Sequence, residues 1–330
     1  MEKKKSYPQI SIVVPFYNEQ DNIDELYQSL TEVLAGLRVA YELIFIDDGS
    51  RDNTYQILMK LYQKDKNVQI IKLKRNFGQT AALQAGFDFA QGEIIISMDG
   101  DLQHDPHDIP LLLSKMEEGY DIVSGWRKIR KDNFLSRKLP SWAANRIMRS
   151  LSGVKIHDFG TTFKAYKKEV MRGLHLYGEL HRFIPALISR TGVKIAEVPI
   201  KNIVRQKGRS KYGLSRVRRV LLDLLTVKFI ISFIDRPLQF FGLVGLGLGS
   251  IGFTIAFILT LGFYFFGWSA RENLGNLLLS VFLMVVGIQL IMTGLLAEVI
   301  SRIYFVTHEI KIYSTEEIKS HRDEENREQE

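Results

Sequence analysis

Two long stretches without a charged residue lie near the end of the sequence, from Leu238 to Ala270 and from Asn273 to Ala297. Each is longer than the roughly 20 apolar residues that cross the hydrocarbon core of a bilayer. Buried helices of soluble proteins rarely reach this length and purity. Because only a short polar connector separates the two stretches, the sequence predicts a hairpin of two membrane-spanning helices.

The charges around these stretches predict the orientation of the hairpin. Residues 201–236 contain ten Lys and Arg residues and two Asp residues, whereas the connector holds one Arg and one Glu. Arg302 and Lys311 follow the second stretch. Because positive residues stay on the cytoplasmic side, we predict an integral inner (cell) membrane protein with both termini in the cytoplasm. A basic block can also bind nucleic acid, but its place before a span favours the membrane surface, and no nucleic acid is expected.

The segments in and around the hairpin differ in composition. Residues 213–236 mix basic and apolar residues at helical spacing, which favours amphipathic helices on the inner leaflet over an ordinary helix packed on the soluble part. We assign the hairpin to residues 237–302 and expect the charged tail at 303–330 to be partly disordered. Gly245 and Gly249 form a GxxxG pair, which permits close helix packing and suggests a homo-oligomer.

Strand patterns alternate with helical patterns through residues 1–212. Short apolar runs indicate strands at 10–14, 41–46, 68–73, 94–98 and 121–124. Apolar residues at helical spacing indicate helices at 19–37, 52–62, 78–90 and 105–118. This alternation predicts an α/β domain with a doubly wound, mostly parallel sheet. No G-x-G-x-x-G follows the first strand and the chain has no G-K-[ST] loop, so a dinucleotide fold and a P-loop are not supported.

Polar clusters follow three of the predicted strands. They are PFYNE at residues 15–19, DDGS at 47–50 and DGD at 99–101. Ligands of parallel sheets bind beyond the carboxyl ends of the strands. We therefore expect the three clusters to converge at one edge of the sheet.

The DGD cluster has the composition of a site for a hard metal ion. In an extended segment Asp99 and Asp101 point the same way, and Gly100 lets another group approach the backbone closely. Two carboxylates, with Gln103 as a neutral oxygen donor, suit Mg²⁺ or Mn²⁺ completed by phosphates and water. The alternative is a polar turn without function. The chain has no cysteine, which excludes thiolate ligands and disulfides and fits a reducing compartment.

The residues after the DGD cluster have the pattern of a helix start. Asp105 is a good N-cap, Pro106 suits the first helical position, and Asp108 lies near the positive end of the helix dipole. His104 and His107 could bind zinc together with a carboxylate. They lie on a turn and a helix start that face different ways, so we disfavour zinc.

Four motifs taken together resemble one known family. SIVVPFYNE, IDDGS, DGDLQHDP and GRSKYG occur in the order and spacing of the family-2 glycosyltransferases with a GT-A fold. More narrowly, residues 11–212 resemble the dolichyl- and polyprenyl-phosphate sugar synthases, and the two spans resemble those of membrane-anchored glucosyltransferases. The resemblance implies inverting transfer of a sugar from a nucleotide sugar to polyprenyl phosphate at the cytoplasmic leaflet, with Mg²⁺ or Mn²⁺ as the cofactor.

The resemblance also implies roles for particular residues. It implies a nucleotide-sugar pocket lined by Pro15, Tyr17, Glu19, Asp47, Asp48, Asp99 and Gly100. It implies that the lipid phosphate is bound by Arg209, Ser210 and Lys211. It implies catalytic roles for Asp101, Arg127 and Lys211, with the metal held by Asp101 and Gln103. We add Asp158 to this catalytic set as the best candidate for a general base.

Several of these roles have ordinary structural alternatives. Tyr17 could simply pack, Arg127 could pair with a surface acid, and the basic residues of GRSKYG could face anionic lipid. A phosphate monoester is largely a dianion at neutral pH, because its second pKa is about 6. A strong general base is therefore not essential, and Asp158 could act as a base, orient an arginine that binds the acceptor, or cap a loop.

Two other functions fit parts of the sequence. A processive polysaccharide synthase shares the D-x-D pattern, but the Arg-Trp dipeptide of its Q-x-x-R-W motif does not occur in this chain. An inactive membrane protein that binds nucleotide or anionic lipid would not need the complete set of motifs. For the donor we favour UDP-glucose, by analogy with the two-span layout, over GDP-mannose, UDP-GlcNAc or a modified arabinose donor.

Overall fold

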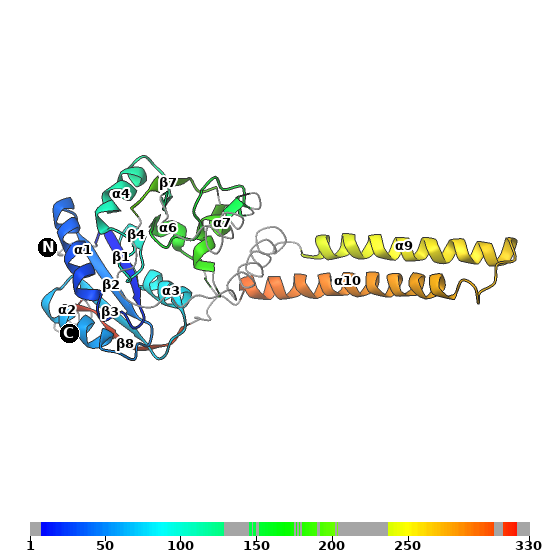
Figure 1. Cartoon of the computed structure of the whole chain (residues 1–330), viewed down its shortest axis with the longest axis horizontal. Helices are drawn as coiled ribbons and strands as arrows, with labels where there is room; N and C mark the ends of the chain where they lie inside the picture. Colours follow the sequence, from blue (N-terminus) through cyan, green and yellow to red (C-terminus); the bar gives the residue numbers. More distant parts are fainter. Residues whose placement is uncertain are drawn as a thin grey trace. The chain divides into compact units, whose positions relative to one another are not determined.

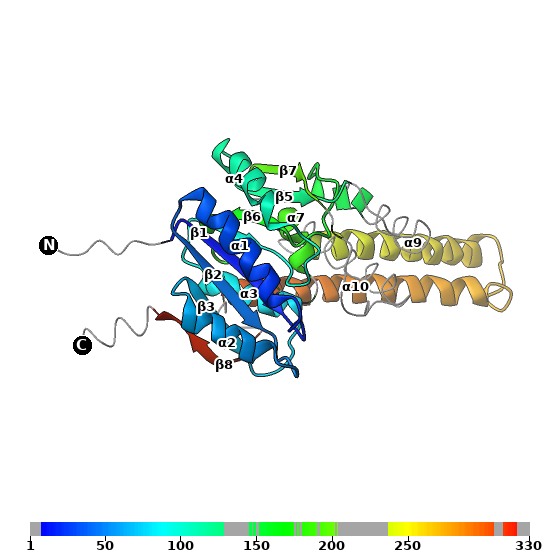
Figure 2. The same ribbon diagram turned by 60° about the vertical axis from the view of Figure 1, so that its left-hand side comes forward.

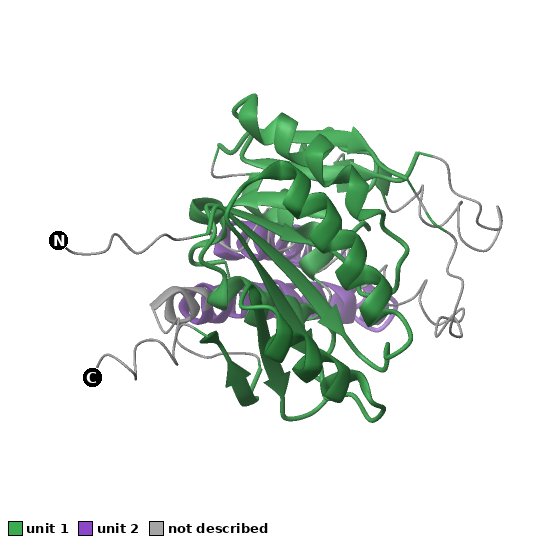
Figure 3. Cartoon of the chain, turned by 90° about the vertical axis from the view of Figure 1, so that its left-hand side faces the viewer, with its two compact units in different colours: residues 1–227, 311–330 green, residues 228–310 purple. Residues whose placement is uncertain are grey.

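A computed structural model of the chain describes residues 8–128, 145–146, 148–149, 152–174, 176, 178, 180–189, 192–201, 203, 237–306 and 313–321. The chain forms two compact units, coloured green and purple in Figure 3. The first unit contains residues 1–227 together with 311–330, and the second contains residues 228–310. The predicted amphipathic segment at 213–236 lies outside the described residues.

The first unit is built on one eight-stranded sheet with the strand order β7-β5-β6-β4-β1-β2-β3-β8. The neighbouring strands β1, β2, β3 and β8 can be followed in Figure 1. The strands are β1 Ile10–Phe16, β2 Tyr41–Asp47, β3 Val68–Leu73, β4 Ile94–Ser97, β5 Ile122–Trp126, β6 Lys164–Lys167, β7 Ile195–Pro199 and β8 Thr315–Lys319. β1 is parallel to β2 and β4, β2 to β3, and β5 to β7. β6 and β8 run antiparallel to their neighbours. The predicted doubly wound, mostly parallel sheet is confirmed.

Helices cover both faces of this sheet. They are α1 Ile23–Leu37, α2 Thr54–Lys64, α3 Gln79–Phe89, α4 Ile109–Glu117, α6 Lys168–Met171 and α7 Ile184–Ile188, with single 3₁₀ turns η1 Pro106–Asp108 and η3 Leu180–Phe183. Buried side chains of α1, α2 and α4 share one hydrophobic cluster with alternate residues of the central strands, such as Ile12 and Phe45. α3 packs on the other face, where Gly86 allows it to approach the side chain of Val13.

The direction of the strands determines which residues meet at each edge of the sheet. β1 and β2 pair residue for residue, from Ile10 with Tyr41 to Phe16 with Asp47. Their residues are almost all buried, as expected for central parallel strands that are covered on both faces. The carboxyl ends of β1 to β5 therefore lie together at one end of the strands, which we name the carboxyl edge of the sheet. Because β6 is antiparallel, the loop that precedes it, residues 157–163, reaches the same edge.

Three strands are additional to the five predicted from the sequence. β6 and β7 are short, and β8 lies within the charged segment that we assigned to a tail. β8 pairs with β3 and is the outermost strand on that side of the sheet (Figure 2). Nearby, the Tyr313 hydroxyl donates to Asp88 at 2.8 Å, and Lys72 pairs with Glu316 at 2.9 Å. Part of the predicted tail therefore belongs to the α/β domain, while its end at 322–330 lies outside the described residues.

The second unit contains two long apolar helices, α9 Pro237–Phe265 and α10 Leu274–Val306. Pro237–Phe265 and Leu274–Ile300 are long and apolar enough to cross a membrane, with mean hydropathies of 2.0 and 2.3. Only 17% of each apolar window is buried, so most of these apolar side chains are exposed, unlike those of a core helix. Exposed apolar surface of this length suits contact with lipid.

Glycines bring the two helices of the hairpin into close contact. A Cβ on Gly245 would lie 2.5 Å from the carbonyl oxygen of Gly287, and one on Gly252 would lie 2.6 Å from that of Ser280. The backbone of Gly249 also lies beside Gly287. The GxxxG pair is thus used inside one chain, and the homo-oligomer that we expected from it stays a prediction.

Candidate active site

The three polar clusters lie at the edge of the sheet where the parallel strands end. PFYNE ends β1, DDGS ends β2, and DGD follows β4. The first two clusters are joined directly. The backbone N–H of Asn18 donates to the Ser50 hydroxyl at 3.0 Å, and the backbone N–H of Arg51 donates to the Asn18 side chain at 2.8 Å. The expected convergence of the first two clusters is therefore present in the structure.

The residues predicted for the nucleotide pocket after β1 differ in their surroundings. Pro15 lies within β1 opposite Ile46, and Tyr17 is half-buried. The backbone N–H of Glu19 donates to the Thr54 hydroxyl at 3.1 Å. The Glu19 carboxylate accepts a hydrogen bond from the Asn22 side chain at 2.6 Å. These contacts tie the start of α1 to the start of α2.

The two aspartates after β2 have different environments. Asp48 accepts three hydrogen bonds, from the backbone N–H groups of Phe77 at 2.7 Å and Gly78 at 2.9 Å and from the Asn76 side chain at 3.0 Å. Burial raises the pKa of Asp48 to about 6. Asp47 is fully buried, and one of its carboxylate oxygens, Oδ2, has no hydrogen-bond partner. Asp48 therefore holds the loop after β3, whereas Oδ2 of Asp47 can still accept a hydrogen bond from a ligand.

The DGD cluster forms a turn and not an extended segment. β4 ends at Ser97, residues 100–101 are in a turn, and Leu102 has a φ of 60°. Asp99 and Asp101 therefore do not lie in one extended segment, which was the basis for predicting that their side chains point the same way. Asp99 accepts from the Gln79 side chain at 2.5 Å, and Asp101 accepts from the Gln103 side chain at 2.7 Å.

The close approach expected at Gly100 comes from the protein itself. A Cβ at this position would lie 2.5 Å from Cδ1 of Phe16 and 3.1 Å from the carbonyl oxygen of Pro15. Gly100 therefore lets the DGD turn pack on the end of β1. Burial raises the pKa of the neighbouring Asp99.

The predicted helix start after this turn has the expected form. Asp105 is the N-cap of the turn η1, Pro106 is its first residue, and the Asp105 carboxylate accepts from the backbone N–H of His107 at 3.0 Å. His107 is exposed beside Asp105, whereas His104 is buried and stacked on Phe163. Within the part of the chain that the structure describes, no group of three or more His, Cys, Asp and Glu side chains could hold a metal.

Arg127 and Asp158 form a partly buried ion pair at the same edge. Nε and Nη2 of Arg127 donate to the two carboxylate oxygens of Asp158 at 2.8 and 3.1 Å, and the side chains are 17% and 4% exposed. Asp158 also accepts from the backbone N–H of Gly160 at 3.1 Å. Its carboxylate thus contacts both a guanidinium and the backbone of its own loop, which fits two of the alternatives that the sequence left open, orienting an arginine and capping a loop.

Several residues near this pair did not stand out in the sequence. Lys164 on β6 is fully buried, and Glu197 on β7 accepts from the backbone N–H groups of His157 and Asp158 at 2.8 and 2.9 Å. Arg182 and Lys164 lie close enough to Asp99 to stabilise its charge. A lysine between the apolar residues Phe163 and Ala165, at the start of a short strand, is the sequence signal that could have indicated Lys164.

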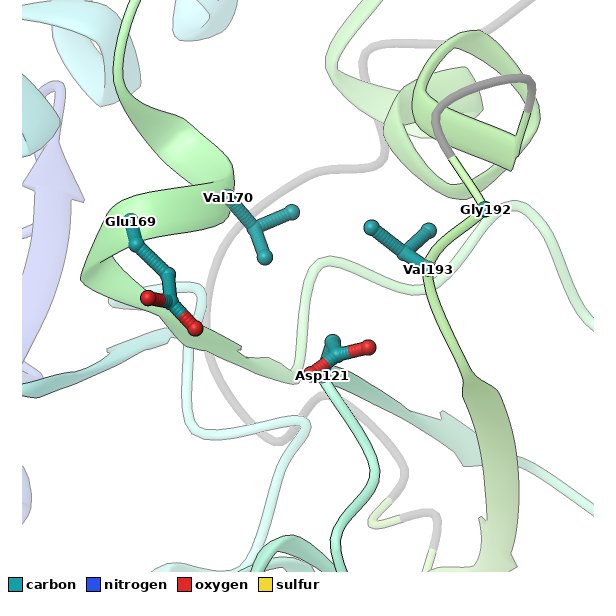
Figure 4. A pocket seen from close by; sticks show the side chains of 5 residues that line it. All are labelled: Asp121, Glu169, Val170, Gly192 and Val193. Atoms are coloured by element: carbon teal, nitrogen blue, oxygen red, sulfur yellow. The ribbon is translucent and has the colours of Figure 1, made fainter.

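The acceptor-binding residues predicted from GRSKYG cannot be placed. Arg209, Ser210 and Lys211 lie outside the described residues. A separate hollow is lined by Asp121, Glu169, Val170, Gly192 and Val193 (Figure 4). Asp121 precedes β5 and Val193 precedes β7, so this hollow lies at the amino ends of the parallel strands, opposite the polar clusters.

Comparison with known proteins identifies the family. Residues 11–174 match the family described as Glycosyl transferase family 2. A protein of Rhizobium johnstonii named dodecaprenyl-phosphate galacturonate synthase is 42% identical over 304 residues, which cover 90% of this chain and 89% of that protein. A protein of Shewanella sediminis named undecaprenyl-phosphate 4-deoxy-4-formamido-L-arabinose transferase is 36% identical over 296 residues, covering 89% of this chain and 88% of that protein.

Solved structures share the fold of the first unit. Glucosyl-3-phosphoglycerate synthase from Mycobacterium tuberculosis, in complex with Mn²⁺, UDP-glucose and phosphoglyceric acid, has a TM-score of 0.53 at 21% identity, covering 68% of this chain and 80% of that chain. The same enzyme in complex with Mg²⁺ and UDP has a TM-score of 0.53 at 20% identity, with the same coverage. The chain therefore has the GT-A fold and belongs to glycosyl transferase family 2, as a glycosyltransferase of the branch whose members are named for polyprenyl-phosphate sugar transfer.

Proposed function

We propose that this glycosyltransferase moves a sugar from a nucleotide sugar to polyprenyl phosphate at the cytoplasmic face of the membrane, with inversion at the anomeric carbon. The observation that carries the proposal is the pair of relatives, which match nine-tenths of the chain and are both named for a polyprenyl-phosphate acceptor. The two candidate spans support it, because a lipid acceptor requires an enzyme at the membrane surface.

The nucleotide would be bound where the first two polar clusters meet. We assign this contact to Pro15, Tyr17, Glu19 and Asp47. The unpartnered Oδ2 of Asp47 supports its assignment, because a buried carboxylate oxygen without a donor is costly unless a ligand supplies one. We predicted Asp48 for the same pocket, but its three hydrogen bonds to the 76–78 loop favour a role in shaping it.

The DGD turn would hold the donor diphosphate with a divalent cation. Asp101 and Gln103 lie in contact, with the Gln103 side-chain N–H donating to the Asp101 carboxylate at 2.7 Å. The oxygen atoms of this carboxylate and this amide would suit Mg²⁺ or Mn²⁺, and two such residues leave room for the phosphate oxygens and water that these ions retain. Asp99 and Gly100 would lie against the ribose and diphosphate. A cation bound there would neutralise the charge that develops on the departing diphosphate.

Arg127 would stabilise phosphate charge next to this site. Its guanidinium is held in one orientation by Asp158, which suits it to a fixed phosphate position at little cost in side-chain entropy. The acceptor needs little activation, because a phosphate monoester is mostly a dianion at neutral pH. We therefore assign Asp158 an orienting role. Lys211, with Arg209 and Ser210, stays a prediction for binding the lipid phosphate.

The donor sugar is identified by a direct screen. UDP-glucose stays our prediction from the two-span layout, but the two relatives are named for galacturonate and for a formamido-arabinose. The experiment is a screen of nucleotide sugars with purified full-length protein, Mg²⁺ and undecaprenyl phosphate, read by mass spectrometry of the lipid products. One donor should give a polyprenyl-phosphate sugar in clear excess. A product that grows by repeated addition of sugar would indicate a processive synthase and contradict the proposal.

Both termini are proposed to lie in the cytoplasm. Pairing of β8 with β3 supports this topology, because a segment after the second span can join the domain before the first span only on the same side of the membrane. The cysteine-free chain allows a clean test with single introduced cysteines and a membrane-impermeant thiol reagent in right-side-out cells. Ser269→Cys in the connector should be labelled and Ser320→Cys should not. The reverse pattern would contradict the topology.

A further inference from the structure

Lys164 is a charged residue in a position that usually holds an apolar one. It lies at the start of β6, its side chain is fully buried, and it ranks among the largest side chains without solvent contact in the described part of the protein. Its Nζ donates to the carbonyl oxygens of Phe159, at 3.3 Å, and of Thr161. The ammonium group therefore binds two points of the loop at residues 157–163.

This loop carries Asp158, the residue that orients Arg127. Its other end is held by Glu197, through the backbone N–H groups of His157 and Asp158. Its middle is held by the Ser97 hydroxyl, which donates to the carbonyl oxygen of Thr162 at 2.5 Å. Lys164 thus completes a set of side chains, from three different strands, that fix the backbone on both sides of Asp158.

Stability alone does not account for a lysine at this position. Burial lowers the pKa of Lys164 to about 7, which shows that the site disfavours the charged form. The carboxylates of Asp158 and Asp99 oppose this effect, whereas Arg127 and Arg182 add to it. Replacing a buried charged group by an apolar side chain of similar volume is often neutral or stabilising. The cost of burying this charge therefore favours a reason other than stability for a lysine here, and its contacts with the loop at residues 157–163 supply one.

We propose that Lys164 is a positioning residue for glycosyl transfer, which holds the loop at residues 157–163 so that Asp158 presents the guanidinium of Arg127 to the reacting phosphates. This inference rests on the proposed function of the carboxyl edge of the sheet. Lys164 does not touch the substrates and acts through Asp158.

The test is a double-mutant cycle on the full-length protein with Lys164→Met and Asp158→Asn, using the donor found in the screen and undecaprenyl phosphate. Lys164→Met should lower kcat by about 10- to 100-fold, because small displacements of a positioned group have effects of this size, while the KM for the donor changes little. In the Asp158→Asn background the same change should lower kcat by less than about threefold, because the residue through which it acts is already altered.

Lys167→Met is the matched control. Lys167 lies on the same strand, is partly exposed, and pairs with Asp121 at 2.7 Å near the other edge of the sheet. It should leave kcat unchanged. Lys164→Gln, which keeps one N–H donor near the carbonyl oxygens, should retain more activity than Lys164→Met.

Three results would overturn the inference. One is an additive cycle, in which Lys164→Met costs as much in the Asp158→Asn background as in the wild type. Another is undiminished kcat in Lys164→Met. The third is a loss of folding in both Lys164→Met and Lys164→Gln, because the lysine would then serve stability. Wild-type protein that forms no lipid-linked sugar overturns the proposed function itself, which separates that failure from the three above.

Discussion

Replacing Asp158 by Asn removes the charge that faces Arg127 and leaves the shape of the side chain almost unchanged. The carboxylate is 4% exposed and receives two hydrogen bonds from the guanidinium, at 2.8 and 3.1 Å. The amide of Asn can accept only one of them. A hydrogen bond to a charged group contributes about 1.5–3 kcal/mol, and each 1.4 kcal/mol or so corresponds to a factor of ten in rate. We therefore expect kcat/KM to fall about 10- to 100-fold.

The pH dependence of this loss separates an orienting role from that of a general base. Initial rates of lipid glycosylation are measured for wild type and Asp158→Asn from about pH 5.5 to 8, a window that spans the second pKa of the acceptor phosphate, near 6. If Asp158 orients Arg127, the ratio of the wild-type rate to the Asp158→Asn rate stays constant across this pH range. A ratio that rises below about pH 6 would refute this reasoning, because a protonated acceptor would then need Asp158 as a base.

A carboxylate of similar kind elsewhere in the sheet serves as the control. Asp121 pairs with Lys167 at 2.7 Å and accepts from the backbone N–H of Lys194 at 2.8 Å, at the edge opposite the candidate site. Asp121→Asn should leave the rate and its pH dependence unchanged. A loss equal to that of Asp158→Asn would mean that the effect comes from general destabilisation.

Three further predictions concern stability and are measured as melting temperatures of the full-length protein in detergent. Gly100→Ala should lower the free energy of unfolding by about 1–3 kcal/mol, because the new Cβ would lie 2.5 Å from the ring of Phe16. An unchanged melting temperature would contradict this prediction. Gly287→Leu should separate the two helices of the hairpin, since its Cβ would lie 2.5 Å from an opposing carbonyl oxygen, whereas Gly247→Leu, with open space around it, should not. Because the pKa of Lys164 is lowered to about 7, the unfolded chain holds a proton that the folded chain lacks from about pH 7 to 10. The wild type should therefore gain stability relative to Lys164→Met as pH rises through this window, and a falling difference would contradict the assignment.

The central strands and their polar ends could be predicted because their sequence signal is local. β3 occupies the predicted residues 68–73, and β1 and β2 extend one or two residues beyond the predicted ends. Strands covered on both faces need continuous apolar runs, and such runs are easily seen. The place of the polar clusters at one edge then follows from the parallel direction of the strands.

The antiparallel strands could not be predicted because their pairing depends on distant segments. β8 has the sequence TEEIK, which is typical of an exposed edge strand as well as of a disordered tail. Its partner β3 lies more than two hundred residues earlier in the chain. The sequence offers no local sign of that pairing.

The contacts within the candidate site were only partly predictable. The DGD cluster and Arg127 indicated carboxylate and phosphate chemistry, but the turn at residues 100–101, in which Gly100 packs on Phe16, is visible only in the tertiary structure. In the same way, the sequence left three roles open for Asp158, and the orienting role that we propose rests on its contact with Arg127, which only the tertiary structure shows. The sequence thus predicts which groups are present, whereas the tertiary structure determines which of them meet.

The most direct test of the central claim is formation of a lipid-linked sugar at the DGD turn. Full-length wild type and Asp101→Ala are incubated with nucleotide sugars, Mg²⁺ and undecaprenyl phosphate, and the lipids are analysed by mass spectrometry. The wild type should form a polyprenyl-phosphate sugar, and Asp101→Ala should form it at least about 100-fold more slowly, as expected when stabilisation of the leaving group is lost. No lipid-linked sugar from any donor, or an undiminished rate in Asp101→Ala, would contradict the claim.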